Sequence, residues 1–113
     1  MDCIFCAIIK KQIPADIVFE NDRVLAFRDI HAQAPVHILI VPKKHITTLD
    51  EVVSADQSLL GEIQIVARDL ARQENVHVDG YRVVANCGPA AGQAVLHLHY
   101  HVLGGRKFSW PPG

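Results

Sequence analysis

Short apolar segments separated by turn-forming residues dominate the first forty residues of the chain. The segments 17–20 and 23–27 flank Asn21-Asp22 and together predict a β-hairpin. A third apolar run, 36–41, stands between two prolines and predicts a strand that is buried on at least one face. The first part of the chain is therefore expected to contribute three strands to a sheet.

Two further segments have patterns typical of helices. The apolar run 4–9 predicts a short helix, which Pro14 helps to end. Ser54, followed three residues later by Gln57, has the form of a capping box and predicts the start of a longer helix. Apolar residues then recur at helical spacing along one stripe, at Leu59, Ile63, Val66 and Leu70.

The last third of the chain returns to strands. The segment 81–86 predicts one strand, the segment 87–93 predicts a loop, and a final strand is expected from about Val95 to Leu103. This order of elements favours an α+β fold with a mainly antiparallel sheet and the long helix across one face. Residues 1–113 are too few for two cores, so a single domain is expected.

The charge balance limits the partners that the chain can bind. Lys and Arg total 11 and Asp and Glu total 12, which gives a formal net charge of -1. That balance argues against a nucleic acid polymer or an anionic membrane as partner. No apolar segment approaches the length of a membrane span, and the first residues lack the runs of a signal peptide. The cytoplasm is therefore the expected compartment.

The segment 97–101, His-Leu-His-Tyr-His, carries three of the seven histidines. Successive side chains of a strand point to opposite faces, so His97, His99 and His101 are expected to share one face. Three imidazoles there must find hydrogen bonds or a metal ion, or lie open to solvent. A solvent-facing strand that happens to carry histidines is the simpler alternative.

The loop before the histidines supports a site for an anion. Gly92 lets a ligand approach the main chain closely, and the amides of Gln93, Ala94 and Val95 are then expected to face a phosphate. A neutral imidazole is a competent nucleophile near pH 7 because its pKa lies close to that value. We therefore predict attack on phosphorus by His99, the middle histidine.

The segment 92–106, with its alternation of histidine and apolar residues, resembles the signature of the histidine-triad (HIT) superfamily. Segments along nearly the whole chain resemble the Hint branch of that superfamily, at 13–15, 27–30, 33–37, 41–45 and 110–113. The resemblance implies a HIT-like fold with a five-stranded sheet, one long helix and a short N-terminal helix. It also implies a homodimer.

The activity implied by the resemblance is hydrolysis of purine nucleoside phosphoramidates, that is, AMP- or GMP-linked amines or aminoacyl adenylates. It proceeds through a nucleotidyl-histidine intermediate, and no catalytic cofactor is expected. One alternative is a dinucleoside polyphosphate hydrolase or nucleotidyl transferase of a sister branch. Another is a nucleotide-binding scaffold without turnover. The short chain and its ending at 110–113 favour the Hint branch.

The resemblance further implies roles for single residues. His99 is the nucleophile, His101 and His37 act at the phosphate, and Asp29 binds the ribose hydroxyls. The residues expected to wall the base are Phe5, Ile8, Ile13, Phe27 and Ile30. The residues expected on the phosphate side are Asn86, Gly92, Gln93, Ala94 and Val95. The C-terminal tail reaches the partner's site in the dimer, so Trp110 is expected to influence substrate choice.

Ala94 departs from the pattern of the resemblance. Hint proteins often carry serine there, and its hydroxyl is thought to assist the departing amine. Without it, the leaving nitrogen must be protonated by another group, such as His101, or the amine step becomes slower. Even an important hydrogen bond to developing charge is worth no more than roughly 3 to 4 kcal/mol, so turnover is expected to slow without being abolished.

The pair Cys3-x-x-Cys6 forms a second group of interest, because two cysteines at this spacing often bind a metal. His45 and His97 are candidates for the other two ligands of a structural zinc. Some bacterial members of the superfamily resemble the chain at these four positions. The alternatives are two small buried cysteines and a redox pair, which is disfavoured because no strand precedes the motif.

Overall fold

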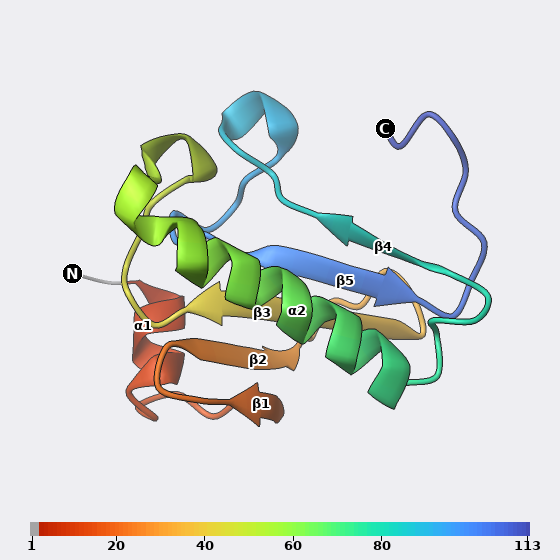
Figure 1. The fold of residues 1–113 in the computed structure, drawn as a ribbon, viewed down its shortest axis with the longest axis horizontal. Helices are drawn as coiled ribbons and strands as arrows, with labels where there is room; N and C mark the ends of the chain where they lie inside the picture. Colours follow the sequence, from red (N-terminus) through yellow and green to blue (C-terminus); the bar gives the residue numbers. More distant parts are fainter. Residues whose placement is uncertain (1–2) are drawn as a thin grey trace.

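One antiparallel sheet of five strands organises the chain, and the strands lie in the order β1-β2-β3-β5-β4 (Figure 1). The structure is a computed structural model and describes residues 3–113. The strands are β1 (Ile17–Glu20), β2 (Val24–Arg28), β3 (Val36–Pro42), β4 (Tyr81–Val84) and β5 (Tyr100–Gly104). Every neighbouring pair of strands is antiparallel. The predicted α+β fold and its hairpin, β1–β2, are therefore confirmed.

Two α-helices accompany the sheet. The short helix α1 (Ile4–Ile9) has the predicted bounds, and the long helix α2 (Gln57–Gln73) lies across one face of the sheet (Figure 1). The whole predicted stripe of α2, Leu59 to Leu70 at helical spacing, is buried. Within residues 3–113, no helix has both the length and the apolar character that crossing a membrane requires.

The start of α2 differs from the predicted capping box. Ser54 opens a 3₁₀ turn, Ser54–Asp56, and the α-helix begins only at Gln57. The Asp56 carboxylate accepts the main-chain N–H of Val53 at 3.1 Å and the ammonium group of Lys44 at 2.7 Å. Asp56, and not Ser54, caps this turn because its carboxylate accepts from both donors at once, and the negative charge strengthens both hydrogen bonds. Two other 3₁₀ turns lie at Leu49–Glu51 and Pro89–Ala91.

The sheet has an apolar cluster on each face, because alternate residues of each strand point to opposite sides. Val24 and Ala26 of β2 belong to the cluster beneath α2. Leu25 and Phe27, the alternate residues of the same strand, pack with Phe5 and other residues near α1. The second face is covered only in part, because α1 is much shorter than α2. That partial cover leaves room for a site.

The predicted start of the last strand was wrong: β5 begins at Tyr100, not at Val95. The register of β3 with β5 would place Pro42 opposite Leu98, and proline has no N–H to continue the ladder. Leu98 N–H instead donates to the carbonyl of Ile46 at 2.6 Å, beyond the end of β3. His97 and His99 therefore lie in an irregular segment before the strand.

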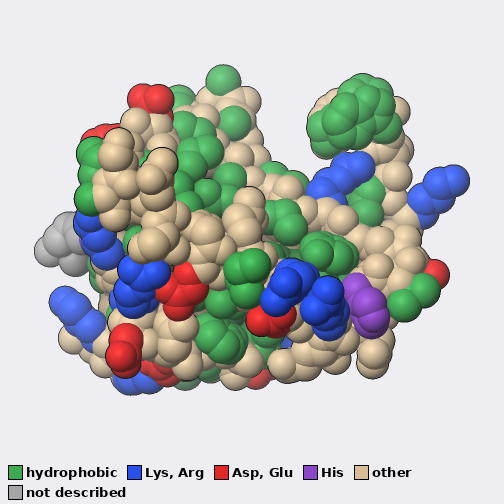
Figure 2. All heavy atoms as spheres, viewed as in Figure 1, with side chains coloured by type: hydrophobic (Ala, Val, Ile, Leu, Met, Phe, Trp, Pro, Cys, Tyr) green, Lys and Arg blue, Asp and Glu red, His purple; other side chains and the backbone are tan. Residues whose placement is uncertain are grey.

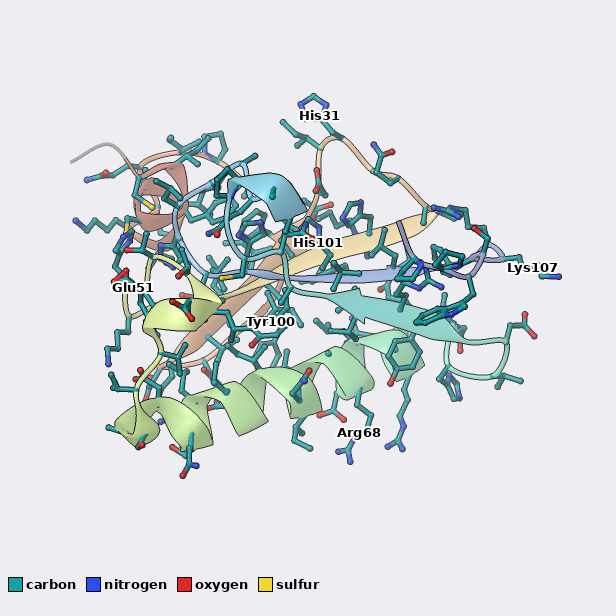
Figure 3. All side chains as sticks on the ribbon, turned by 90° about the horizontal axis from the view of Figure 1, so that it is seen from above. His31, Glu51, Arg68, Tyr100, His101 and Lys107 are labelled. Atoms are coloured by element: carbon teal, nitrogen blue, oxygen red, sulfur yellow. The ribbon has the colours of Figure 1, made fainter. Side chains whose placement is uncertain are left out.

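The side-chain alternation nevertheless continues through this irregular segment. Leu98, Tyr100 and Val102 belong to the cluster beneath α2. Figure 3 shows Tyr100 on the α2 side of the sheet and His101 on the other side. The histidines thus face the partly covered side of the sheet, as the pattern predicted, although only His101 is in a strand.

Candidate active site

A pocket with a volume of about 370 Å³ opens on the face of the sheet opposite α2. Its walls combine apolar side chains with the imidazoles of His99 and His101. The predicted site residues that line it are Phe5, Ile8, Ile13, Phe27, Asp29, Ile30, Ala94, Val95, His99 and His101. They come from α1, β2, β5 and the segments beside them, so residues distant in sequence meet here.

Phe5 of α1 connects the apolar wall with the histidines. Its ring centroid lies 5.5 Å from that of Phe27 and 5.1 Å from that of His99, in edge-to-face geometry. Phe5 also lies 5.9 Å from the His97 ring. Edge-to-face aromatic pairs fix ring orientation as well as burying area. The short helix α1 thereby closes one side of the pocket.

His99 is held with one nitrogen bound and the other free. Its Nδ1 lies 2.7 Å from the carbonyl oxygen of His97, and a carbonyl only accepts, so Nδ1 carries the proton. The lone pair of the neutral ring is then on Nε2. Every fully buried side-chain nitrogen or oxygen in residues 3–113 has a hydrogen-bond partner. Nε2 of His99 has none among these residues, so it reaches the surface, although the side chain as a whole is buried.

His101 is oriented by a chain of hydrogen bonds that begins in the main chain. The N–H of Gln33 donates to Nδ1 of His37 at 3.0 Å, so the neutral His37 ring carries its proton on Nε2. That nitrogen lies 2.9 Å from Nδ1 of His101, which must accept. The proton of His101 is therefore on Nε2. His101 thus offers a donor to the pocket, whereas His99 offers a lone pair.

The charge state of these imidazoles follows from burial. Burial, together with the neighbouring His99 and His37, lowers the pKa of His101 to about 4. Burial also lowers the pKa of His37, against the opposing effect of Asp29, whose carboxylate oxygen lies 3.4 Å from Nε2 of His37. His37 and His101 are therefore neutral near pH 7, and their proton positions are set by the hydrogen-bond chain.

The third histidine of the motif, His97, faces a different group of side chains. Its Nε2 lies 2.8 Å from the carbonyl oxygen of Pro42, so the proton is on Nε2 and the lone pair on Nδ1. Nδ1 lies 3.3 Å from the sulfur of Cys3, 3.6 Å from that of Cys6 and 3.0 Å from Nδ1 of His45. The Cys6 sulfur lies 3.3 Å from Nδ1 of His45. We refer to these four residues as the Cys/His cluster.

The Cys/His cluster has the arrangement of a metal site. All four donor atoms lie within 4.8 Å of one another. Zinc bonds of about 2.3 Å to sulfur and about 2.0–2.1 Å to nitrogen, in a tetrahedron, place ligand atoms about 3.3–3.8 Å apart. The separations in the cluster are close to these values. The His97 N–H bond to Pro42 is also the kind of outer contact that fixes a metal-binding imidazole.

The loop before the histidines differs in part from the predicted anion cradle. The N–H of Gln93 donates to the carbonyl of Gly88 at 3.1 Å and is not available to a ligand. Its side-chain amide donates to the carbonyls of Thr47 and Val95 and accepts the N–H of Gly88. Gln93 thus holds the loop together. The left-handed backbone of Gly92, with φ of 86°, turns the chain back on itself and so brings Gln93 close to Gly88.

Two amides remain for a ligand in this loop. The N–H groups of Ala94 and Val95 find no acceptor among residues 3–113. Both residues line the pocket beside the imidazoles. Of the three amides expected in the cradle, those of Ala94 and Val95 are therefore available to a ligand, whereas that of Gln93 is not.

Several predicted site residues do not line the pocket. These are Asn86, Gly92, Gln93 and Trp110, while His37 contributes through His101. The Trp110 side chain is 82% exposed. Figure 2 shows the C-terminal segment standing away from the rest of the molecule.

Sequence reasoning missed three main-chain groups and, besides Leu39, five residues that line the pocket: Ile4, Pro14, Ala15, Arg28 and His31. The Gln33 amide and the carbonyls of His97 and Pro42 set the proton positions of the imidazoles, and no sequence pattern marks a main-chain atom. Leu39 also lines the pocket. The alternation of β3 could have found it, because Leu39 lies two residues after His37 and so shares its face.

Comparison with known proteins places the chain in a family. Residues 10–108 match the HIT domain family. An uncharacterized HIT-like protein of Synechococcus elongatus is 54% identical over 112 residues, which cover 99% of this chain and 97% of that protein. The crystal structure of a HIT family hydrolase from Legionella pneumophila Philadelphia 1 is similar with a TM-score of 0.97 and 51% identity, covering 99% of this chain and all of that one.

A more distant structure shares the same fold. The crystal structure of a histidine triad nucleotide-binding protein from Candida albicans has a TM-score of 0.82 and 32% identity. The match covers 97% of this chain and 83% of that one. The resemblance drawn from the histidine motif is thus confirmed: the chain belongs to the HIT domain family.

Proposed function

We propose that the chain hydrolyses purine nucleoside phosphoramidates, with His99 as the nucleophile. The observation that carries the proposal is the free lone pair of His99 Nε2, which the carbonyl of His97 fixes beside an apolar pocket. The names of two relatives agree with the general class of activity, because one is a HIT family hydrolase and another a histidine triad nucleotide-binding protein.

The pocket offers separate surfaces to the parts of a nucleotide. The rings of Phe5 and Phe27 with Ile8 form an apolar surface that suits a purine base. Asp29 also lines the pocket and carries carboxylate oxygens that can accept from ribose hydroxyls. The N–H groups of Ala94 and Val95 and Nε2–H of His101 are donors for phosphoryl oxygens.

The reaction divides into two balanced steps. In the first, Nε2 of His99 forms a bond to the α-phosphorus and the P–N bond breaks, so its electron pair goes to the leaving nitrogen, which takes a proton from water. The His99 ring becomes positive, and its Nδ1–H bond to the His97 carbonyl stabilises that charge. In the second step, water attacks phosphorus, loses a proton to solvent and returns the electron pair to Nε2.

The donor of His101 serves a defined purpose in this scheme. Its pKa of about 4 means that it stays neutral near pH 7 and stabilises a phosphoryl oxygen by a hydrogen bond. It does not need to give up its proton. Ala94 has no hydroxyl to assist the departing amine, so the expulsion of the amine is the step that we expect to be slow.

Steady-state kinetics on an adenosine phosphoramidate test the proposal. His99→Ala should lower kcat by about 10⁴-fold or more, as expected for loss of a nucleophile. His77→Ala is the matched control, because His77 is exposed and lies outside the pocket. Wild-type turnover by His99→Ala would rule out the proposed nucleophile. Faster turnover of a diadenosine polyphosphate than of the phosphoramidate would favour the sister activity.

We further propose that the Cys/His cluster holds a structural zinc ion. Two thiolates and two imidazoles suit zinc, and the separations of the donor atoms fit a tetrahedron. When bound, zinc supplies cross-linking and no bond-making chemistry. Cys3 and Cys6 flank the first turn of α1, so the cluster would fasten α1 to the segment that carries His97. The main-chain carbonyl of His97, in turn, orients His99.

A homodimer belongs to the same proposal. Trp110 is 82% exposed, whereas tryptophan is on average largely buried in folded proteins, and within one chain it does not line the pocket. A second copy that covers Trp110 would explain both facts. Sedimentation at micromolar concentration should give the mass of a dimer, and only monomer would contradict this part of the proposal.

A further inference from the structure

The histidine motif continues into Gly104-Gly105-Arg106, and the proposed chemistry does not use this part. Both glycines permit close approaches of the chain where it leaves β5. A Cβ on Gly104 would lie 2.7 Å from Cβ of Val76. Gly105 has φ of 91°, and a Cβ there would lie 2.9 Å from Cβ of Pro35. The main chain at Gly105 is therefore pressed against the loop that leads into β3.

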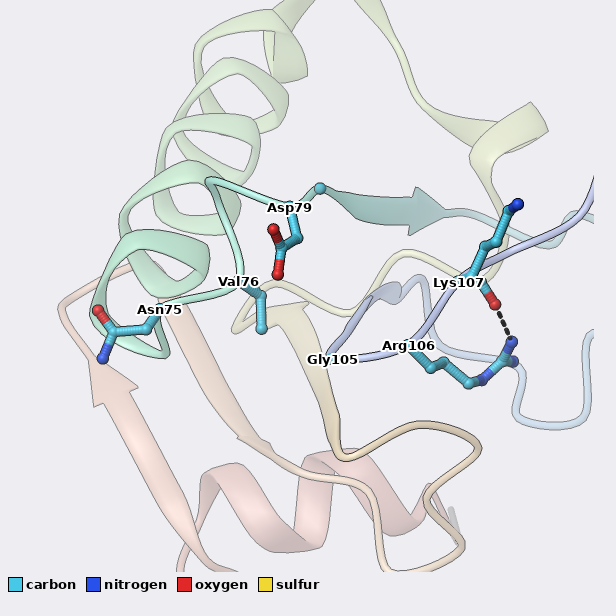
Figure 4. A pocket seen from close by; sticks show the side chains of 7 residues that line it. Asn75, Val76, Asp79, Gly105, Arg106 and Lys107 are labelled. Carbon is cyan, nitrogen blue, oxygen red and sulfur yellow. Dashed lines mark hydrogen bonds between the residues drawn. The ribbon is translucent and has the colours of Figure 1, made fainter.

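Arg106 binds this loop directly. Its Nε–H donates to the carbonyl of Gln33 at 2.9 Å, and its terminal N–H donates to the carbonyl of Lys107 at 3.1 Å. Figure 4 shows the guanidinium turned toward the Lys107 carbonyl and away from Asp79, at the edge of a hollow of about 310 Å³. Arg106 thus uses its donors on main-chain carbonyls. Arg106 forms no salt bridge with any residue that the structure describes.

The Arg106 guanidinium also lies over an aromatic ring of the C-terminal tail. Its central carbon lies 4.3 Å from the centroid of the Phe108 ring, and that of Arg82 lies 5.1 Å from the same centroid. Arg82 additionally donates to the carbonyl of Ser109 at 2.9 Å. Two arginines therefore hold the tail, but of these two only Arg106 also holds Gln33.

The main-chain N–H of Gln33 determines the proton positions of His37 and His101. Its carbonyl accepts from Arg106, and its N–H donates to Nδ1 of His37. Residues 30–33 are exposed, with few packing contacts to fix them. If this loop moved, His37 could carry its proton on Nδ1 instead. Nε2 of His37 would then accept from His101, and His101 would turn a lone pair, not a donor, toward the pocket.

We propose that Arg106 is a positioning residue: by holding the carbonyl of Gln33, it keeps the Gln33 amide on His37 and so keeps a hydrogen-bond donor of His101 directed at the phosphate. The catalytic part of this inference rests on the proposed function. The structural part does not, because the proton positions of two imidazoles can be measured without a substrate.

Three variants separate the possible roles of Arg106. Arg106→Ala removes the bond to Gln33. Arg106→Lys keeps the charge but lacks the planar fork that reaches two carbonyls at once. Arg82→Ala is the matched control, because it removes the other cation–π contact and the Ser109 bond while leaving Gln33 held. Circular dichroism and thermal unfolding check that each variant is folded.

The first readout is the ¹⁵N NMR spectrum of the imidazoles, which distinguishes a protonated from an unprotonated ring nitrogen. Wild type and Arg82→Ala should show His37 and His101 with the proton on Nε2. Both Arg106 variants should show a mixture of the two proton positions. Wild-type proton positions in Arg106→Ala would overturn the proposal. A mixture of equal size in Arg82→Ala would also overturn it, because looseness of the tail alone would then be the cause.

The second readout is kinetic. We expect kcat for the phosphoramidate to fall about 10-fold in both Arg106 variants while KM changes by less than about 3-fold, which corresponds to a lost transition-state interaction. Full activity in Arg106→Lys would show that charge, and not the bond to Gln33, is what matters, and would contradict the proposal. If wild type does not turn over the phosphoramidate, the proposed function fails, while the NMR comparison still decides the role of Arg106.

Discussion

The two imidazole groups of this molecule contain histidines from a single sequence motif, yet they are arranged in opposite ways. In the Cys/His cluster, Nδ1 of His97 faces two sulfurs and a second imidazole. In the pocket, Nε2 of His99 has no partner among residues 3–113. Each neutral ring donates its single N–H to a main-chain carbonyl.

The difference teaches how a carbonyl can assign a histidine to a task. The Pro42 carbonyl accepts from Nε2 of His97, which leaves Nδ1 for the cluster. The His97 carbonyl accepts from Nδ1 of His99, which leaves Nε2 for the pocket. The same residue type is thus suited to binding a metal in one place and to attacking phosphorus in the other, because the second nitrogen is in a different position.

The largest effect should come from removing the sulfurs of the Cys/His cluster. Cys3→Ser with Cys6→Ser should lower bound zinc from about one per chain to about zero. The free energy of unfolding should fall by about 3 kcal/mol or more, the contribution of a ligand held at 100 times its Kd or above. Metal analysis without chelators and urea unfolding measure the two quantities.

Cys87→Ser is the control for this double variant, since Cys87 is exposed and outside the cluster. It should keep both the zinc and the stability of wild type. Absence of zinc from the wild-type protein would contradict the proposed metal site. So would a double variant as stable as wild type.

A smaller effect, on KM for the phosphoramidate, is expected in the pocket, where Asp29 is proposed to bind the ribose. Asp29→Asn removes a charged acceptor, and a hydrogen bond to a charged group contributes about 1.5–3 kcal/mol. KM for the phosphoramidate should therefore rise about 10- to 100-fold, with a smaller change in kcat. A substrate without ribose hydroxyls should bind wild type and Asp29→Asn equally weakly. A KM that does not change would show that Asp29 serves only its contacts with His31 N–H and His37.

The pH dependence of stability should distinguish the pocket from the cluster. In the folded chain, burial and the neighbouring His99 and His37 lower the pKa of His101 from its ordinary value of 6.5 to about 4, although Asp29 acts in the opposite direction. Between these values the unfolded chain binds the proton more readily, so His101 makes stability fall as pH falls from about 6.5 to 4, and no further below. The loss cannot exceed about 1.4 kcal/mol per pH unit for one group.

The measurement is the free energy of unfolding of wild type and His101→Asn across this pH range. If the proposed zinc is released at low pH, the stability of both proteins falls alike, so their difference isolates His101. The variant should show the shallower decline. Parallel curves would contradict the lowered pKa.

The smallest effect is expected at Ala94, which borders both the pocket and a second hollow beside the Cys/His cluster. Ala94→Ser adds one hydroxyl near the leaving group, and one hydrogen bond contributes about 0.5–1.5 kcal/mol. The kcat for an amine leaving group should rise about 2- to 10-fold. A leaving group that departs without a proton, such as a nitrophenolate, should show no gain. An equal gain for both substrates would mean that the hydroxyl acts on the phosphate instead.

Much of the fold could be predicted because its patterns are local. The stripe of α2 and the hairpin of β1 and β2 depend on residues close in sequence. The start of β5 could not be predicted, because it depends on Pro42, which lies more than fifty residues away in the chain. The prediction that Ser54 caps α2 was also wrong, because Asp56 accepts a hydrogen bond from Lys44, which lies outside the helix.

The candidate site divides in the same way. The alternation of the motif placed the three imidazoles on one side of the sheet, and this holds even where the chain is irregular. Gln93 was expected at the phosphate, but it bonds to Gly88, Thr47 and Val95 within its own loop. An amide side chain can serve either purpose, and only the positions of the surrounding carbonyls decide between them.

The sequence by itself indicated the family, through the resemblance of its histidine motif, and the α+β fold, through the periodicity of its apolar residues. It also determined which residue types are available for chemistry. Only the tertiary structure decided which nitrogen of each imidazole is free. That choice is made by main-chain groups of Gln33, Pro42 and His97, which every residue possesses and no sequence pattern distinguishes. Their positions exist only once the strands and loops have packed together.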